Sequence, residues 1–247
     1  MAILSLYDYT GEALRPWALA GHACYAIDIQ HTGDEVELFD GGGSISYIRV
    51  DLYHSEAFAT LAKLVGDSCT FGMAFPVCTD LAVSGAAHFA SKEAARPGFQ
   101  RQAADHAIRC GLFFEELGVP YFIENPVSRL ATLWRKPDYR FHPYEYGGYL
   151  NDDEATHPTW PDYIAPRDAY SKKTCLWAGQ GFIMPEPKPV ACESFGASTQ
   201  YQLLGGKSMK TKNIRSATPR GFAKAVFEVN NRSNNHDRPI QTSFRPI

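Results

Sequence analysis

One cysteine and one glutamate stand where two apolar runs of this 247-residue chain end. Cys78 follows the run 69–75, and Glu124 closes the run 119–124. A thiolate is a strong nucleophile once its pKa falls, and a carboxyl group beside it can give or take a proton. No histidine is close in sequence to either residue, so a cysteine-protease pairing is unsupported. A lone cysteine is more often a small buried hydrophobic residue, so the rest of the chain must decide.

Polar residues also end the earlier apolar runs. Asp28 and Asp51 come at the ends of the second and third runs, and Thr10 and Gly11 come between the first run and a helical pattern. In α/β sheets an acid after the second strand grips the ribose of a nucleotide-type cofactor, and a helix amino terminus stabilises polar or anionic groups. Asp51 could accept a hydrogen bond from an adenine amino group. Together these residues indicate an adenosine-containing cofactor, although each acid alone could instead cap a helix.

The elements that must position these residues alternate between strand and helix. Apolar runs predict strands at residues 2–7, 23–29, 46–50, 69–75 and 119–124. Helical spacing predicts helices at residues 12–20, 56–65, 99–117, after 126 to 134, and about 218–229. The acidic, glycine-rich residues 33–43 predict a loop or hairpin tip. This alternation predicts an α/β fold with a Rossmann-like, doubly wound, mostly parallel sheet covered on both faces. Ligands bind beyond the carboxyl ends of such strands, so the acids and Cys78 should share one edge.

Composition along the chain predicts four regions. They are a cofactor-binding and catalytic α/β domain at 1–134, a small irregular aromatic-rich substrate lobe at 135–205, a basic segment and final helix returning to the main domain at 206–230, and a loose tail at 231–247. The lobe should contain short strands such as residues 173–179.

The charge distribution limits the partners. The formal net charge is −3, so binding of a polyanion would need a local patch. Residues 206–224 carry six basic residues and no acid, which predicts the most positive surface of the protein. No apolar run approaches the roughly 18 residues of a membrane span, and the start lacks the basic region of a signal peptide. We therefore expect a cytoplasmic protein with no membrane partner.

The six cysteines are scattered without a Cys-x-x-Cys pair, which favours reduced thiols. A zinc set could be drawn from Cys175, Cys192, His142 and His157, but their spacing fits no compact ligand pattern. No metal is expected.

Four segments resemble motifs of the DNA (cytosine-5) methyltransferases, in the family's order and spacing. They are FPVCTDLAVSG at 75–85, similar to the Pro-Cys catalytic loop; FIENPVSRL at 122–130, similar to the Glu-Asn motif; LYDYTGEALRPWALAGHACYAIDI at 6–29, similar to the first cofactor motif; and RSATPRGFAKAVFE at 215–228, similar to the carboxyl-terminal segment of small phage-type members. The resemblance implies a class I methyltransferase-like fold. It also implies the cytoplasm of a phage-infected bacterial host as the location.

The resemblance implies a covalent mechanism with S-adenosylmethionine as cofactor. Cys78 would attack carbon 6 of a cytosine in DNA, Glu124 with Asn125 would hold or protonate ring nitrogen 3, and carbon 5 would take the methyl group. A target base in duplex DNA would be flipped out of the stack. The implied cofactor residues are Tyr7, Asp8, Thr10, Gly11, Asp28, Ile29, Asp51, Leu52 and Pro76. The expected substrate residues are Ser84, Arg129, Lys207, Lys210, Lys212 and Arg215.

The chain departs from the family pattern in several places. Val77 replaces a second proline, and Tyr9 stands where the cofactor loop usually has glycine. A long target-recognition domain is absent, which implies low sequence specificity or a smaller substrate. The Gln-x-Arg-x-Arg motif is not visible; candidate substitutes are Arg129, Arg135, Arg140 and Arg167.

Three alternatives remain open at the level of sequence. The same thiol chemistry could modify a free cytidine nucleotide, which the negative charge and the missing recognition domain favour. The changed cofactor loop leaves room for another one-carbon donor. A catalytically silent methyltransferase-like protein that only binds nucleic acid is the third.

Overall fold

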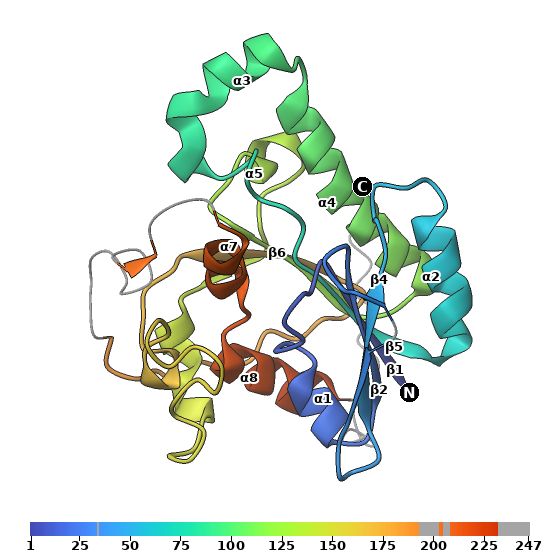
Figure 1. Cartoon of the computed structure of the whole chain (residues 1–247), viewed down its shortest axis with the longest axis vertical. Coiled ribbons are helices and arrows are strands. Elements are labelled where there is room, and N and C mark those ends of the chain that lie inside the picture. The colour runs from blue at the N-terminus through green and yellow to red at the C-terminus, as the bar shows by residue number, and fades with distance from the viewer. Residues whose placement is uncertain (34, 193–202, 205–207, 232–247) are drawn as a thin grey trace.

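The computed structural model describes residues 1–33, 35–192, 203–204 and 208–231. Within them, one sheet of eight strands runs through the molecule (Figure 1) in the order β3-β4-β2-β1-β5-β6-β8-β7. The strands are β1 Ala2–Leu6, β2 Ala23–Asp28, β3 Glu35–Leu38, β4 Ser44–Arg49, β5 Cys69–Ala74, β6 Tyr121–Pro126, β7 Tyr139–Phe141 and β8 Thr174–Gly179. The α-helices are α1 Arg15–Leu19, α2 Ala57–Val65, α3 Phe89–Ala95, α4 Phe99–Leu117, α5 Leu130–Leu133, α7 Met209–Ser216 and α8 Arg220–Asn230.

The sheet is mixed but mostly parallel. Neighbouring strands β4, β2, β1, β5 and β6 pair in parallel. β3 is antiparallel to β4 at one end, and β8 and β7 continue the sheet in antiparallel fashion beyond β6. The protein is therefore an α/β protein, and the order of all eight strands is not the simple 3-2-1-4-5 arrangement.

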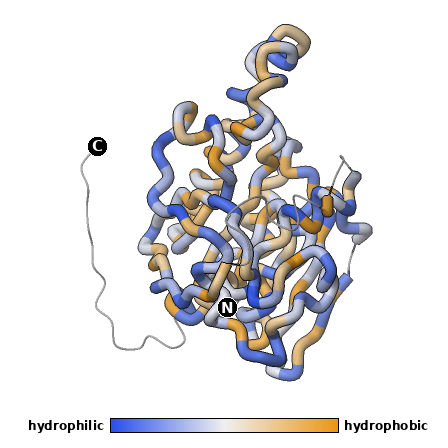
Figure 2. Tube along the Cα trace, turned by 90° about the vertical axis from the view of Figure 1, so that its left-hand side faces the viewer, coloured by the Kyte–Doolittle hydropathy of each residue, from blue (hydrophilic) through white to orange (hydrophobic). Residues whose placement is uncertain are grey.

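Helices cover both faces of the sheet, as the apolar strands require. Leu4 and Leu6 of β1 belong to the core cluster that contains α2 and α4, whereas Ile3 belongs to the cluster that contains α1 and α8. Figure 1 shows these two helix pairs on opposite sides of the strands, and Figure 2 shows the hydrophobic segments alternating along the chain. On the α1 side, Trp17 stacks on Phe71 of β5 with ring centroids 4.9 Å apart.

Close packing against α4 fixes the position of β5. A Cβ on Gly72 would lie 2.3 Å from the ring of Phe114, so only glycine lets the helix approach this strand. Phe114 is fully buried. This contact fixes how closely β5 lies to α4, and so positions the loop after β5 that carries Cys78.

Most predicted elements are present, and several regions differ. Residues 33–43 were predicted as a loop or hairpin tip; the structure has a hairpin, with residues 35–38 forming the unpredicted strand β3 and residues 39–43 the tip. α3 was not predicted; it stands away from the body at the top of Figures 1 and 2. The basic segment contains a helix, α7, and residues 143–149 and 166–168 form short 3-10 helices. β7 and β8 of the predicted substrate lobe join the main sheet.

Among the helices of the described residues, none combines the length and apolarity needed to cross a bilayer.

Candidate active site

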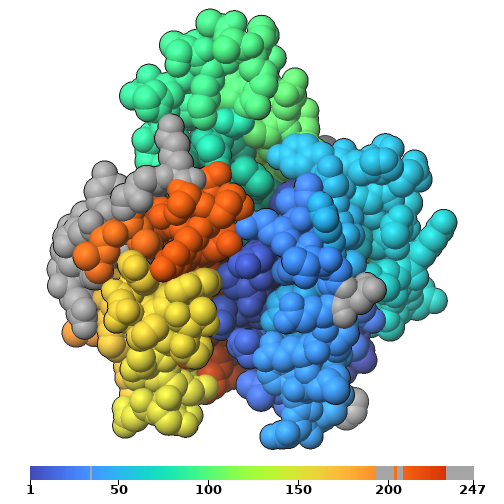
Figure 3. All heavy atoms as spheres, viewed as in Figure 1, coloured from blue at the N-terminus to red at the C-terminus, as the bar shows by residue number. Residues whose placement is uncertain are grey.

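The candidate site lies where the parallel strands end. Because β4, β2, β1, β5 and β6 run in the same direction, their carboxyl ends share one edge. Asp51, Asp28, the loop 7–11, Cys78 and Glu124 follow these strands in that spatial order. In Figure 3 the dark-blue residues after β1 lie in a depression between the yellow segment and the lighter blue one. The structure thus brings the predicted edge residues together.

The backbone after β5 turns sharply at Cys78. Leu81 and Ala82 both donate their N–H groups to the carbonyl oxygen of Cys78, at 2.9 and 2.8 Å. Asp80 accepts a hydrogen bond from Lys92 of α3 at 2.8 Å, which ties the turn to the projecting helix. Cys78 as a residue is half-buried in this turn.

Asn125 fastens the end of β6 to this loop. Its Nδ2 donates to the carbonyl oxygen of Pro76 at 3.1 Å, and Asn125 is 1% exposed. The segments 76–78 and 124–125 are therefore joined directly, although they are distant in sequence.

Replacing Asn125 with alanine should reduce both stability and loop order. The buried carbonyl of Pro76 would lose its donor, which costs about 1–3 kcal/mol of unfolding free energy. Urea unfolding measures this loss, with Asn151→Ala at the surface as the control. A loss for Asn125→Ala no larger than that of the control would show that the bond does not hold the loop.

Glu124 opens into a pocket with an aromatic lining. The pocket is lined by Phe75, Glu124, Phe141, Lys172, Thr174, Ser216, Ala217, Thr218, Pro219 and Phe222. Within the described chain, Glu124 Oε1 and Asn125 Oδ1 are buried without a hydrogen-bond partner. Buried polar atoms are nearly always paired, so the unpartnered Glu124 oxygen in the pocket wall is a candidate ligand contact, whereas Asn125 projects from the other face of β6.

The charge of the Glu124 carboxyl group affects the pKa of the Cys78 thiol. Burial raises the pKa of Cys78, and the nearby Glu124 carboxyl raises it further, while Lys172 and Arg215 act in the opposite direction. Burial also raises the pKa of Glu124, against the effect of Lys172. A protonated Glu124 therefore favours the thiolate of Cys78, because a like charge is then missing beside it.

Lys172 is the functional candidate that sequence reasoning missed. It lines the pocket beside Glu124, and its Nζ donates to the carbonyl oxygen of Arg215 at 3.0 Å. It precedes β8, whose antiparallel pairing with β6 sets Leu176 opposite Glu124. The proximity of Lys172 to Glu124 could not be inferred without knowing that β8 lies next to β6.

Asp8 stabilises the loop after β1 through hydrogen bonds to its sequence neighbours. Its carboxylate accepts hydrogen bonds from Ser5 Oγ at 2.7 Å and from the Gly11 N–H at 2.8 Å, and Thr10 Oγ1 is 3.4 Å away. His31 Nε2 lies 3.0 Å from the carbonyl oxygen of Asp8. Burial raises the pKa of Asp8, and these hydrogen bonds oppose that rise. Asp8 therefore shapes the loop, with its oxygens directed to its own neighbours.

Two residues of this loop have positive φ angles. Tyr7 has φ 57°, which is uncommon for a residue with a side chain. Gly11 has φ 69°, and a Cβ there would lie 2.7 Å from the hydroxyl of Tyr47. Such backbone conformations are often found at ligand sites, and glycine is required at position 11.

The two acids on the neighbouring strands each cap a turn. Asp28 accepts the N–H of Gln30 at 2.8 Å and is buried, and Asp51 accepts the N–H of Tyr53 at 2.9 Å and is exposed. Each carboxylate has a second oxygen that is not used in these bonds. The remaining predicted cofactor residues near this edge are the exposed Ile29 and the buried Leu52 and Pro76.

The predicted substrate residues surround the site at the surface. Arg129 donates its N–H to the carbonyl of Leu81, beside the Cys78 turn, and is exposed. Ser84 is exposed in the 3-10 helix Val83–His88. The exposed predicted residues of α7 are Lys210, Lys212 and Arg215; Lys207 lies outside the described residues. Of the proposed arginine substitutes, Arg140 on β7 lies opposite Cys175 of β8, which pairs with Asn125.

The residues considered as zinc ligands are not gathered. No group of three or more His, Cys, Asp or Glu side chains in the described ranges could hold a metal ion. The edge therefore offers a thiol, carboxyl groups and cations for its chemistry.

Comparison with models of protein families and with curated proteins finds no match for this chain. The assignment of function therefore depends on the geometry of this edge and on the motifs of the sequence.

Proposed function

We propose that this chain is an S-adenosylmethionine-dependent methyltransferase that modifies carbon 5 of cytosine in DNA through a covalent cysteine adduct. The observation that carries the proposal is the coupling of the Cys78 thiol to the Glu124 carboxyl at one strand edge, with Asn125 joining their loops. The four motifs supply the identity of the reaction. The geometry supplies a thiol and a carboxyl group on adjacent strand ends, with Glu124 in the wall of the pocket.

The strand arrangement supports a class I methyltransferase-like core. When only the parallel strands are counted along the chain, β4-β2-β1-β5-β6 follow the 3-2-1-4-5 order of doubly wound nucleotide-binding sheets. The switch in strand order falls between β1 and β5. The loop 7–11 and Cys78 follow those two strands, at the place where such sheets bind ligands.

The residue types at this strand edge suit addition of a thiolate to a pyrimidine ring. Cys78 Sγ forms a bond to carbon 6, while Glu124 gives its proton to ring nitrogen 3. The unpartnered Asn125 Oδ1 is an acceptor for the exocyclic amino group. After carbon 5 has taken the methyl group, a base removes its proton and the bond to Cys78 breaks. Phe75 lines the pocket, while Phe141 and Phe222 stack on each other with ring centroids 4.0 Å apart and form its floor.

The loop residues fit an adenosine-containing donor. S-adenosylmethionine supplies an electrophilic methyl group. Asp28 would hold its ribose hydroxyls and Asp51 its adenine amino group, each through the carboxylate oxygen left over from its turn. Tyr9, in place of the family's glycine, stacks on His31 with ring centroids 5.7 Å apart. The Tyr9 ring is thereby held beside the end of β2. Val77, which stands in place of the family's proline, has an exposed side chain.

DNA rather than a free nucleotide is favoured by α7. The exposed Lys210 and Lys212 lie on this helix, which ends at Ser216 in the wall of the pocket. Phosphate contacts at that position would hold the strand on either side of a flipped cytosine. A free nucleotide would use only one such contact.

The proposal is tested by incubating the protein with DNA and S-adenosylmethionine, then analysing the nucleosides by mass spectrometry. We expect 5-methylcytosine in DNA and little modification of free cytidine nucleotides. Modification of nucleotides but not of oligonucleotides would contradict the DNA assignment. An unmodified DNA with retained DNA binding would contradict the enzymatic assignment altogether.

Replacing Lys172 with methionine should slow the reaction by making the thiolate harder to form. Removal of this cation raises the pKa of Cys78, since Lys172 lowers it in the wild type. Alkylation of Cys78 by iodoacetamide should then reach its half-maximal rate at a higher pH. The matched control is Lys173→Met, because Lys173 is the exposed neighbour. An unchanged alkylation profile in Lys172→Met would show that this cation does not act on the thiol.

A further inference from the structure

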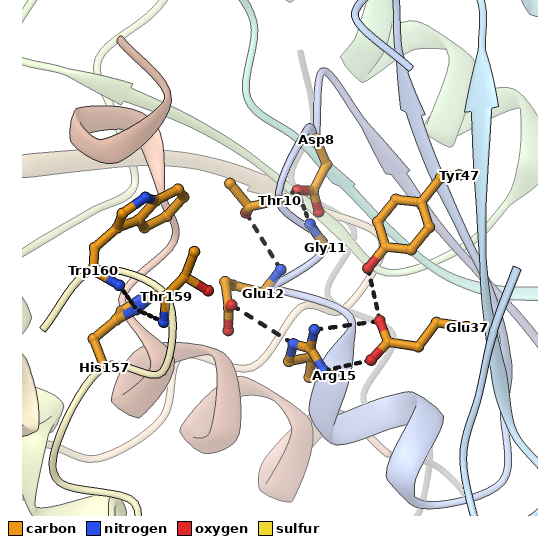
Figure 4. Close-up of polar contacts among 10 residues, drawn as sticks. All are labelled: Asp8, Thr10, Gly11, Glu12, Arg15, Glu37, Tyr47, His157, Thr159 and Trp160. Atoms are coloured by element: carbon orange, nitrogen blue, oxygen red, sulfur yellow. Dashed lines mark hydrogen bonds and ion pairs between the residues drawn. The ribbon is translucent and has the colours of Figure 1, made fainter. Parts of the chain in front are cut away.

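A second group of polar side chains, three of them buried, lies where the loop after β1 meets the segment 154–168 and the start of α8. We call Glu12, Arg15, His157, Asp168 and Arg220 the Glu12 cluster. Arg15 Nε lies 3.6 Å from Glu12 Oε1, and the Gly221 N–H donates to Asp168 Oδ2 at 2.9 Å. Figure 4 shows Thr10 and Glu12 facing the segment that carries His157 and Trp160. None of these residues is needed for the bond-making steps at Cys78.

His157 presents a buried hydrogen-bond donor. Its Nδ1 accepts the N–H groups of Thr159 and Trp160 at 3.2 and 3.1 Å, so this nitrogen carries no proton. Burial, with Arg220 and Arg15 nearby, lowers the pKa of His157 to about 4. The neutral ring therefore has its proton on Nε2. His157 is 1% exposed, and Nε2 has no partner among the residues that the structure describes.

Glu12 presents a buried acceptor in the same cluster. It is 4% exposed, and its Oε2 is without a partner in the described part of the chain. Burial raises the pKa of Glu12, and Arg15 and Arg220, which also act on His157, oppose that rise. The Glu12 N–H donates to Thr10 Oγ1 at 3.3 Å, so Glu12 adjoins the predicted cofactor residues Thr10 and Gly11.

These two atoms match a ligand that carries both an ammonium and a carboxylate group. A carboxylate oxygen accepts from an ammonium group, and an imidazole N–H donates to a carboxylate. The cluster already contains acids and cations in similar number, so a zwitterion leaves its charge balance unchanged, whereas a singly charged ligand would not. Arg220 directly follows Pro219 in the pocket wall, so the cluster adjoins the pocket that Glu124 lines.

We infer that Glu12 and His157 bind the amino-acid end of the methyl donor, with Glu12 Oε2 accepting from its ammonium group and His157 Nε2 donating to its carboxylate. This inference rests on the proposed function, because it needs S-adenosylmethionine as the cofactor. It gives residues 154–168, predicted as part of a substrate lobe, a role in holding the donor.

The inference is tested by calorimetry with two ligands that differ only at this end. S-adenosylhomocysteine carries the amino acid, and 5′-methylthioadenosine keeps the adenosine and sulfur without it. Glu12→Gln and His157→Asn should each weaken S-adenosylhomocysteine binding by about tenfold or more, as expected for loss of a charge-assisted hydrogen bond. Binding of 5′-methylthioadenosine should not change. Asparagine at 157 keeps an acceptor for the backbone N–H groups while withdrawing the Nε2 donor.

The control is Glu37→Gln, which alters the other carboxylate partner of Arg15 and leaves Glu12 intact. It should retain the wild-type preference for S-adenosylhomocysteine, and thermal melting checks that each variant is folded. Equal weakening of both ligands in the folded variants, or no weakening of S-adenosylhomocysteine, would overturn the inference while the donor assignment stands. Equal affinity of the wild-type protein for S-adenosylhomocysteine and 5′-methylthioadenosine would also overturn the inference. Binding of neither ligand by the wild type would overturn the donor assignment and the inference with it.

Discussion

Replacement of Cys78 by serine is expected to lower methyl transfer to DNA by roughly a thousandfold or more, as is typical when a covalent nucleophile is removed. A serine hydroxyl is far less ionised than a thiol at the same place, so addition to carbon 6 would fail. Serine is close in size to cysteine, and the turn depends on the backbone carbonyl of residue 78, so the loop should survive. Transfer of a labelled methyl group from S-adenosylmethionine to a cytosine-containing duplex measures the effect.

Cys192→Ser is the matched control, because Cys192 is the other half-buried cysteine of the described chain. This variant should keep wild-type activity. If Cys78→Ser remained within a few-fold of the wild type, the thiol would not be the nucleophile, and the covalent route would be excluded.

Replacement of Glu124 by glutamine should lower methyl transfer by about a hundredfold or more, the usual contribution of a positioned acid. Glutamine is nearly isosteric but has no proton to give to ring nitrogen 3. The variant should also show a thiol effect of opposite sign. Where Glu124 is ionised it raises the pKa of Cys78, so at a pH above the raised pKa of Glu124 its removal lowers the pKa of Cys78 and makes the thiol react faster with iodoacetamide. If the variant's thiol is alkylated faster while its methyl transfer is slower, the loss of activity reflects the missing proton donor and not disruption of the site.

The pH dependence follows from the same carboxyl group. Burial raises the pKa of Glu124, so it keeps its proton to a higher pH than an ordinary glutamate. Activity that needs this proton is present below the raised pKa and falls as pH increases through it. The falling limb should be absent from the residual activity of Glu124→Gln. Alkylation profiles are best recorded in a Cys192→Ser background, where the other cysteines are buried. An identical pH limb in both proteins would remove Glu124 from the role of acid.

The sequence was most informative where side chains pack on one face. The prediction of a helix at residues 99–117 matches α4 to the residue, because Ala107, Cys110 and Phe114 are buried and Gly118 ends the helix with φ 65°. The edge residues were predicted together for a related reason. Once strands and helices alternate, parallel pairing alone puts the strand ends on one side.

The prediction failed where few side chains are buried, because the sequence there shows no apolar periodicity. β3 was not predicted within the acidic, glycine-rich loop or hairpin tip, because its side chains are mostly exposed; Leu38 is 80% exposed and forms no apolar face. Basic α7 buries only Thr211 and Ile214, which is too little for a visible period. β3 is held by pairing with the neighbouring β4, and α7 by packing on residues distant in sequence, such as Ile164.

The candidate site was predictable as residue types and not as a set of contacts. The resemblance pointed to Cys78 and Glu124, but Lys172 is found only through the sheet neighbours of β6. The same holds for His157, whose isolated position in an irregular segment gives no signal of a buried Nε2 facing the cofactor loop.

The most direct test of the central claim is covalent trapping on a duplex that contains 5-fluorocytosine, with S-adenosylmethionine present. Fluorine at carbon 5 cannot leave as a proton does, so the adduct should persist. Digestion and peptide mass spectrometry should then locate the pyrimidine on Cys78 and on no other cysteine. A cross-link at a different residue, or methylated DNA from a protein that forms no adduct, would contradict the proposed chemistry.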